Sequence, residues 1–236
     1  MNPRRCVPLI LLVSLLCASC SGAPEDLPPE VIVDNSAVYM RALDGFAFRL
    51  QRTGAPVYVD PSGVISFREA EGIFVAPDKV QTTVKVIAPG IVAEVDVIGI
   101  GDLEWETNVF SGEWALVPPE YAFQPAVLFA PVGGIQQALE DYLYDIKLLG
   151  LDELEELPGL TLYHLQGVMD GANVHNLTVG MIDEQMLAIE LWIQPGSFEL
   201  HRALIFDPPN PGVEEGTTWQ FDFWDFDRVI KIVPPV

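Results

Sequence analysis

The sequence has very little cysteine, and all of it lies at one end. The three cysteines, Cys6, Cys17 and Cys20, fall within the first twenty of 236 residues. Because no cysteine pair remains beyond residue 20, disulfide bonds cannot stabilise the folded body of the protein. A buried apolar core must supply the stability instead, and the remaining chain is long enough to form one.

Positive charge is scarce too: 12 Lys and Arg stand against 34 Asp and Glu. Without Arg4 and Arg5 of the N-terminal leader, 10 cations remain against 34 acids, a formal net charge of −24. Such a protein repels phosphate backbones and anionic head groups, which argues against nucleic-acid binding and electrostatic attachment to a membrane. Half of the residues are nevertheless apolar, which predicts an unusually apolar interior.

The sequence also lacks the usual signatures of metal binding and covalent catalysis. His164, His175 and His201 are far apart, with no HxH or HExxH spacing, and there is no Gly-x-Ser-x-Gly motif. The acidic groups at residues 152–156 and 222–227 do not follow the order of an EF-hand loop. A solvated surface is the simpler interpretation of these acids, and calcium binding or paired catalytic carboxylates is the alternative. We therefore expect no metal, no cofactor and no enzymatic activity.

The first twenty residues have the form of a secretory signal peptide. Arg4 and Arg5 precede an apolar run, residues 7–16, which is too short to span a bilayer. The sequence Cys17-Ala18-Ser19-Cys20 resembles a bacterial lipobox, although Cys17 stands where leucine is usual. Residues 1–19 are thus predicted to be a lipoprotein signal peptide, with cleavage near residues 21–23 as the alternative.

Lipidation at Cys20 would place the protein on the extracytoplasmic side of the cell membrane. A diacylglyceryl group brings two acyl chains, which are enough for stable attachment without a basic patch. Residues 20–29 are rich in proline and acids, which is typical of a short tether. We expect one domain over residues 30–236.

Within this domain, period-two alternation of apolar residues predicts many strands and few helices. We expect helices over residues 29–43 and 133–144. The pattern at residues 146–157, where leucines mix with acids, is compatible with a short helix or an irregular apolar lid. We expect strands over residues 45–52, 64–75, 80–87, 91–100, 102–107, 113–117, 161–169, 185–194, 200–206, 217–226 and 229–233.

This order predicts an α+β fold, with one large antiparallel sheet and helices gathered on one face. Several strands are apolar on both faces; Val92 and Ile98, for example, alternate with Val95 and Val97. Either helices cover part of the second face, or that face lines an apolar cavity.

The order and spacing of several local motifs resemble a known family. They include residues 72–86 around Ala76-Pro77-Asp78, the stretch Val97-Ile98-Gly99-Ile100-Gly101-Asp102, and residues 112–114, 129–134, 163–167 and 189–193. Together with the lipobox they resemble the LppX/LprAFG bacterial lipoproteins, relatives of the LolA and LolB lipoprotein carriers. The resemblance implies a curved half-barrel with helices across its concave side, and a hydrophobic cavity that holds the acyl chains of a lipid or glycolipid.

The predicted cavity lining takes one apolar face of the strands and one stripe of the central helix; a solid core is the alternative for each residue. The lining residues are Phe46, Phe48, Leu50, Val84, Val86, Val95, Val97, Ile135, Leu139, Leu143, Tyr163, Leu165, Ile189, Leu191 and Ile193. We expect a monomeric lipid carrier, anchored through Cys20. The alternatives are an accessory or chaperone-like lipoprotein that binds a protein partner and, less favoured, an envelope hydrolase that uses the acidic residues.

Overall fold

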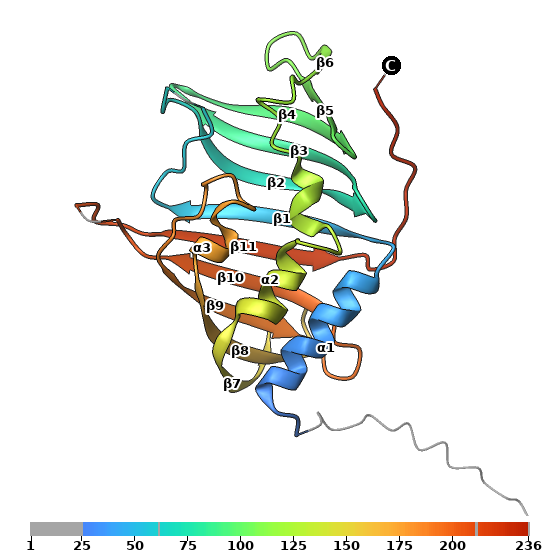
Figure 1. Ribbon diagram of the computed structural model, residues 1–236, viewed down its shortest axis with the longest axis vertical. Helices are drawn as coiled ribbons and strands as arrows, with labels where there is room; N and C mark the ends of the chain where they lie inside the picture. The colour runs from blue at the N-terminus through green and yellow to red at the C-terminus, as the bar shows by residue number, and fades with distance from the viewer. Residues whose placement is uncertain (1–25, 61, 211, 236) are drawn as a thin grey trace, which may run out of the picture.

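A computed structural model describes residues 26–60, 62–210 and 212–235 (Figure 1). Its framework is one antiparallel sheet of eleven strands with helices on one side, which confirms the expected fold class. The helices are α1 (Pro29–Ala42), the 3-10 helix η1 (Pro125–Phe129), α2 (Ile135–Tyr142) and α3 (Ala172–His175). The strands are β1 (Gly45–Gly54), β2 (Ser66–Val75), β3 (Lys79–Ala88), β4 (Ile91–Ile100), β5 (Leu103–Thr107), β6 (Trp114–Leu116), β7 (Tyr144–Glu153), β8 (Thr161–Asp170), β9 (Met186–Ile193), β10 (Leu200–Asp207) and β11 (Thr217–Trp224).

The sheet grows outward from its centre in two directions. Its order is β6-β5-β4-β3-β2-β1-β11-β10-β9-β8-β7, so the first and last strands of the chain are neighbours. From β1 the chain runs by successive hairpins to β6 at one edge. It then crosses the sheet through η1 and α2 to β7 at the other edge, and returns to β11 (Figure 1). This crossing places η1 and α2 over one face, called here the helix-covered face; the other is the open face.

Helix α1 begins where the sequence predicts, with Pro29 in its first turn, a position that needs no backbone donor. It buries Ile32, Val33, Ser36, Ala37 and Met40, which recur at three- and four-residue spacing and form one face of the helix. This face packs on the sheet together with α2, and the two helices lie side by side (Figure 1). The apolar stripe of α1 therefore forms part of the roof over the helix-covered face.

The open face carries two smaller apolar clusters, each covered by an irregular segment. Near β4 to β6, Ile230 and Ile232 of the C-terminal segment pack against Ile98, Trp105 and Trp114. Near β8 to β10, Leu154 and Leu157 pack with Leu162, Trp192 and Leu204. Chain segments thus cover apolar residues of the second face, which explains strands that are apolar on both sides.

The strand predicted over residues 229–233 is wrong. This segment alternates like a strand, but it has no ladder partner and leaves β11 to run toward β5 and β6 (Figure 1). The reason lies in the topology, because both edges of β11 are already paired, with β1 and β10. The segment instead packs its two isoleucines on the open face.

The expectation of a helix or lid over residues 146–157 is also wrong for most of that range. Residues 144–153 form the edge strand β7, whose register with β8 shifts twice, between Tyr144 and Lys147 and between Leu148 and Gly150. These bulges disrupt the period-two pattern on which a strand prediction depends. Only residues 154–157 are irregular, and they cover the open face.

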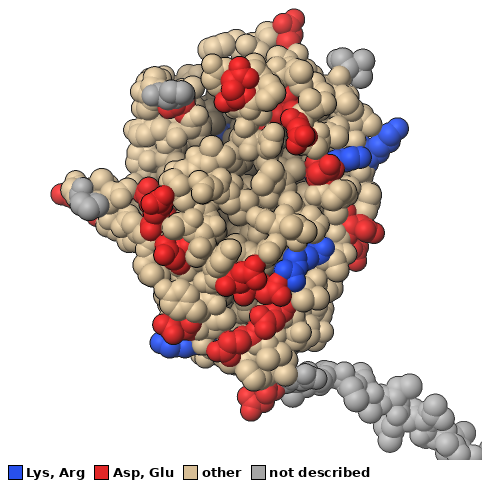
Figure 2. Space-filling model, in the orientation of Figure 1, with Lys and Arg blue, Asp and Glu red and all other residues tan. Residues whose placement is uncertain are grey.

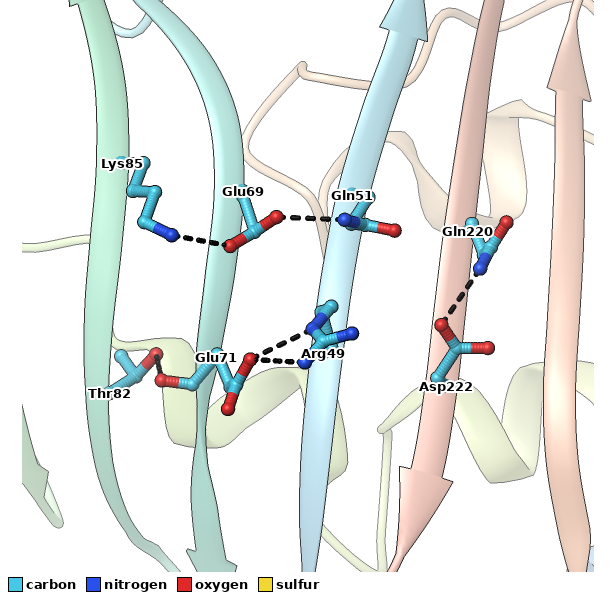
Figure 3. Close-up of polar contacts among 8 residues, drawn as sticks. All are labelled: Arg49, Gln51, Glu69, Glu71, Thr82, Lys85, Gln220 and Asp222. Atoms are coloured by element: carbon cyan, nitrogen blue, oxygen red, sulfur yellow. Dashed lines mark hydrogen bonds and ion pairs between the residues drawn. The ribbon is translucent and has the colours of Figure 1, made fainter. Parts of the chain in front are cut away.

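Between the two apolar clusters, polar side chains follow one another across the open face (Figure 3). Glu69 accepts hydrogen bonds from Gln51 at 2.7 Å and Lys85 at 3.0 Å, and Arg49 pairs with Glu71 at 2.6 Å. These pairs are partly exposed, so each contributes little to stability. They show instead that the middle of this face is in contact with water.

The C-terminal segment generates a stability prediction. The side chain of Ile232 is 4% exposed and that of Val233 is 47% exposed. Ile232→Ala should lower the free energy of unfolding by about 2–5 kcal/mol, because it leaves a cavity beside Ile98. Val233→Ala, the matched control, should change it by less than about 0.5 kcal/mol. Urea unfolding measures both, and equal effects would contradict the packing described.

Candidate functional site: the interface between the helices and the sheet

Most of the predicted lining residues lie together in one buried cluster between the sheet and the helices. The phenylalanines at its centre pack ring against ring, with centroids of Phe46 and Phe129 5.5 Å apart and those of Phe46 and Phe223 5.5 Å apart. Val84 is half-buried against the cluster. The other predicted members are Phe48, Leu50, Ile135, Leu139, Leu143, Tyr163, Leu165, Ile189, Leu191 and Ile193.

Three predicted lining residues lie outside this cluster. Val86 and Val97 are buried and Val95 is half-buried, on the part of the helix-covered face formed by β3 and β4. The register places Val95 opposite Val84, so these strands do present the predicted residues on the expected face. The helices simply do not bring this part of the sheet into the main core.

The cluster also contains residues of α1 and η1 that were not predicted to line the cavity. Ile32, Val33 and Met40 of α1 belong to the cluster, and their helical spacing could have identified them. Phe129 of η1 also belongs to it and contacts four other phenylalanines, but it comes from a segment without periodicity. The sequence pointed to this residue only through the family-like stretch 129–134, which gave it no place in the core.

The helices lie almost directly on the sheet. The gap under α1 and α2 has a volume of about 10 Å³, which leaves room for about one water molecule. Two members of its lining, Ser36 and Gln136, are polar. The other members are Val33, Ala37, Met40, Leu139, Leu191, Ile193 and Leu200. Three residues of the predicted cavity, Leu139, Leu191 and Ile193, therefore meet at this gap.

Few polar contacts fasten α1 to its surroundings. Tyr39 donates a hydrogen bond to Glu199, before β10, at 3.0 Å, and Arg41 forms an ion pair with Glu140 of α2. Burial and the neighbouring Glu199 carboxylate raise the pKa of Tyr39 to about 12, so its hydroxyl remains a donor at neutral pH. These two contacts tie α1 both to the sheet and to α2.

A buried carboxylate fastens the segment that leads into η1. Glu104 of β5 is buried and accepts hydrogen bonds from the backbone N–H groups of Phe123 at 3.2 Å and Gln124 at 2.7 Å. Burial raises its pKa, although the two N–H groups act in the opposite direction. Burial also raises the pKa of Glu106 on the same strand, and the charge of Glu104 adds to this effect. Part of the roof thus depends on a carboxylate that is costly to ionise.

The polar groups considered for catalysis or metal binding are engaged in structural contacts. Asp222 accepts a hydrogen bond from Arg202 at 2.6 Å, and Asp225 pairs with Arg228. His164 lies 2.8 Å from Glu190 and stacks on Trp192. Within residues 26–60, 62–210 and 212–235, no group of three or more His, Cys, Asp or Glu could hold a metal ion. Cys20 and the predicted signal peptide fall outside this described part.

The buried carboxyl group of Glu104 predicts that the stability of the protein depends on pH. A raised pKa means that ionising Glu104 costs more in the folded state, so its contribution to stability falls as pH rises above the unfolded value of about 4.3. The free energy of unfolding of the wild type, minus that of Glu104→Gln, should therefore decrease between pH 4 and pH 8. Urea titrations across this range measure it.

Glu113→Gln at an exposed position controls for the loss of one negative charge. If the Glu104 difference stayed constant or increased with pH, burial would not govern this carboxyl group.

Two solved structures share this architecture. LprF from Mycobacterium bovis superimposes with a TM-score of 0.68 at 15% identity, covering 91% of this chain and 99% of LprF. LppX from Mycobacterium tuberculosis gives 0.61 at 13% identity, covering 89% of this chain and all of LppX. At these identities the likeness shows the half-barrel fold. Among curated proteins, no sequence matches the chain.

The helices cannot cross a bilayer: in the described part of the chain, none is both long and apolar enough. The family model of the LppX_LprAFG lipoproteins matches residues 28–232, nearly the whole of the described sequence. The chain therefore belongs to the LppX/LprAFG lipoprotein family.

Proposed function

We propose that the protein is a lipid-anchored lipid-binding protein that shields acyl chains between its helices and its sheet, on the extracytoplasmic side of the cell membrane. The observation that carries the proposal is the continuous apolar face of the sheet, which is roofed by short helices. Membership of a lipoprotein family supports it. We propose no covalent chemistry, because the binding of an acyl chain needs none.

Acyl chains are costly to expose to water. Each CH₂ group that stays in water costs about 0.8 kcal/mol, so a lipid outside a membrane requires an enclosed apolar surface. Leu191 and Ile193 in the floor and Leu139 in the roof form such a surface around the gap. Each is at most 6% exposed.

Binding requires the roof to move. Ligand pockets commonly have volumes of about 300 Å³ or more, whereas the gap under α1 and α2 has about 10 Å³. The helices must therefore move away from the sheet, which breaks the contacts Tyr39–Glu199 and Arg41–Glu140 and uncovers the buried apolar face of α1. The two polar contacts are partly exposed and weak. The larger cost is the lost apolar burial, which the acyl chains of the ligand offset when they fill the space that opens.

A second function is favoured by the same closed interior. A filled core suits an accessory lipoprotein that binds a protein partner and carries no lipid. The two proposals differ in whether acyl chains enter the fold.

The first experiment tests occupancy. Mature protein carrying Cys20→Ser, which lacks its own anchor, is purified from its host and analysed by native mass spectrometry and organic extraction. We expect nearly stoichiometric acyl lipid. A mass without ligand that stays unchanged after incubation with envelope lipids would favour the protein-binding alternative.

Two variants test whether the lipid binds in the gap under α1 and α2. Ala37 lies in the gap and is 4% exposed, whereas the neighbouring Val38 is 54% exposed. Ala37→Phe should lower lipid occupancy several-fold, at a cost of about 1–3 kcal/mol in stability. Val38→Phe should leave occupancy unchanged. Wild-type occupancy in a folded Ala37→Phe protein would show that lipid binds elsewhere.

The anchor generates a separate prediction. Cys20→Ala should abolish the incorporation of labelled fatty acid into the protein, because the thiol that carries the two acyl chains is absent. Cys17→Ala controls for the loss of a cysteine in the leader and should leave the labelling unchanged. Metabolic labelling with an alkyne fatty acid, followed by immunoprecipitation, measures both. Wild-type labelling of the Cys20→Ala protein would rule out this anchor.

A further inference from the structure

One buried side chain at the gap has an unused hydrogen-bonding atom. Gln136, in the first turn of α2, is 2% exposed and lines the gap together with Ser36 of α1. Among the described residues, nothing donates a hydrogen bond to its Oε1 atom. Folded proteins leave few buried polar atoms without a partner, so this acceptor requires an explanation.

A buried water molecule at the gap would not fully account for the unpaired Oε1 atom of Gln136. A buried water usually makes about three hydrogen bonds. The side chains around the gap offer two polar groups, Gln136 and Ser36, and all the others are apolar. A leucine would fill the position of Gln136 without leaving an unpaired acceptor.

We propose that Gln136 accepts a hydrogen bond from a hydroxyl group of the bound lipid and so helps to determine which lipid binds. This inference rests on the proposed lipid-binding function. Gln136 lies where α2 meets α1, above the floor residues Leu191 and Ile193. When the two helices separate, acyl chains can lie on that floor while the polar end of the lipid stays between the helices.

The charge around the gap indicates the chemical class of the ligand. Next to the gap, α1 contacts the carboxylates of Glu199 and Glu140 and contributes one cation, Arg41. The visible helix side of the molecule carries many Asp and Glu and few Lys or Arg (Figure 2). This disfavours a carboxylate or phosphate head group, and an ionised carboxylate has no donor for Oε1. The ligand class is therefore an uncharged lipid with a free hydroxyl group, such as a monoacylglycerol or diacylglycerol.

The test compares three lipids that share one acyl chain: monooleoylglycerol, methyl oleate and oleate. Binding to the mature protein is measured by native mass spectrometry titration. We expect the wild type to bind monooleoylglycerol about tenfold more tightly than methyl oleate, the effect of about one net hydrogen bond, and to bind oleate weakly. Gln136→Leu should weaken monooleoylglycerol binding about tenfold and leave methyl oleate binding unchanged.

Two further variants make the test specific. Gln137→Leu is the matched control, because it makes the same substitution one position along α2. The side chain of Gln137 forms hydrogen bonds with Gly133 and Asp141 and lies outside the gap. This control should keep the wild-type preference. Gln136→Met, which is unbranched, repeats the test if the leucine variant folds poorly, and thermal unfolding verifies the fold of each variant.

The outcomes separate this inference from the function on which it rests. If all three lipids bind but Gln136→Leu keeps the preference for monooleoylglycerol, the glutamine holds only a water and the inference is wrong. Oleate binding as tightly as monooleoylglycerol would also overturn it. If none of the three lipids binds to the wild type, the proposed function fails together with it.

Discussion

The pairing of β1 with β11 is the constraint on which the rest of the structure depends. It joins residues 45–54 to residues 217–224 at the centre of the sheet and so makes the two halves of the chain one surface. The close approach at its end requires glycine, since a Cβ at Gly54, where φ is 81°, would lie 2.3 Å from the Gly216 carbonyl oxygen. Because each half then extends to its own edge, the connection between them must cross one face, and that crossing supplies much of the roof.

Apolar residues are covered in different ways on the two faces of the sheet. On the helix-covered face, α1, η1 and α2 bury a large, continuous apolar surface. On the open face, two irregular segments bury small clusters, and polar pairs such as Arg49–Glu71 occupy the middle. The apolar cluster on the helix-covered face is the larger of these, which is why the proposed binding site lies there.

The sequence predicted the elements well wherever one side of a segment is buried and the other is exposed. β10 (Leu200–Asp207), which alternates between buried and partly exposed residues, ends one residue after its expected end, and α1 (Pro29–Ala42) ends one residue before its expected end. The failures have specific causes. Residues 144–153 lost their alternation to two bulges. Residues 229–233 alternate like a strand, but they follow β11, whose two edges are already paired, and they pack on the open face instead. For the site, periodicity identified the floor but could not reveal Phe129, nor that the interior is nearly filled, because packing between distant segments leaves no local pattern.

The central strand pair also bears on how the protein folds. Contacts between residues this distant in sequence are slow to form, because much of the chain must be ordered before they can be made. Neither half of the sheet can acquire its central neighbour until the last tenth of the chain is available. If the chain is exported with its N-terminus first, the strands from β1 to β6 would reach the far side while β1 still presents a free edge. Until β11 arrives, this edge of β1 is therefore the place where the growing sheet can pair with a wrong strand.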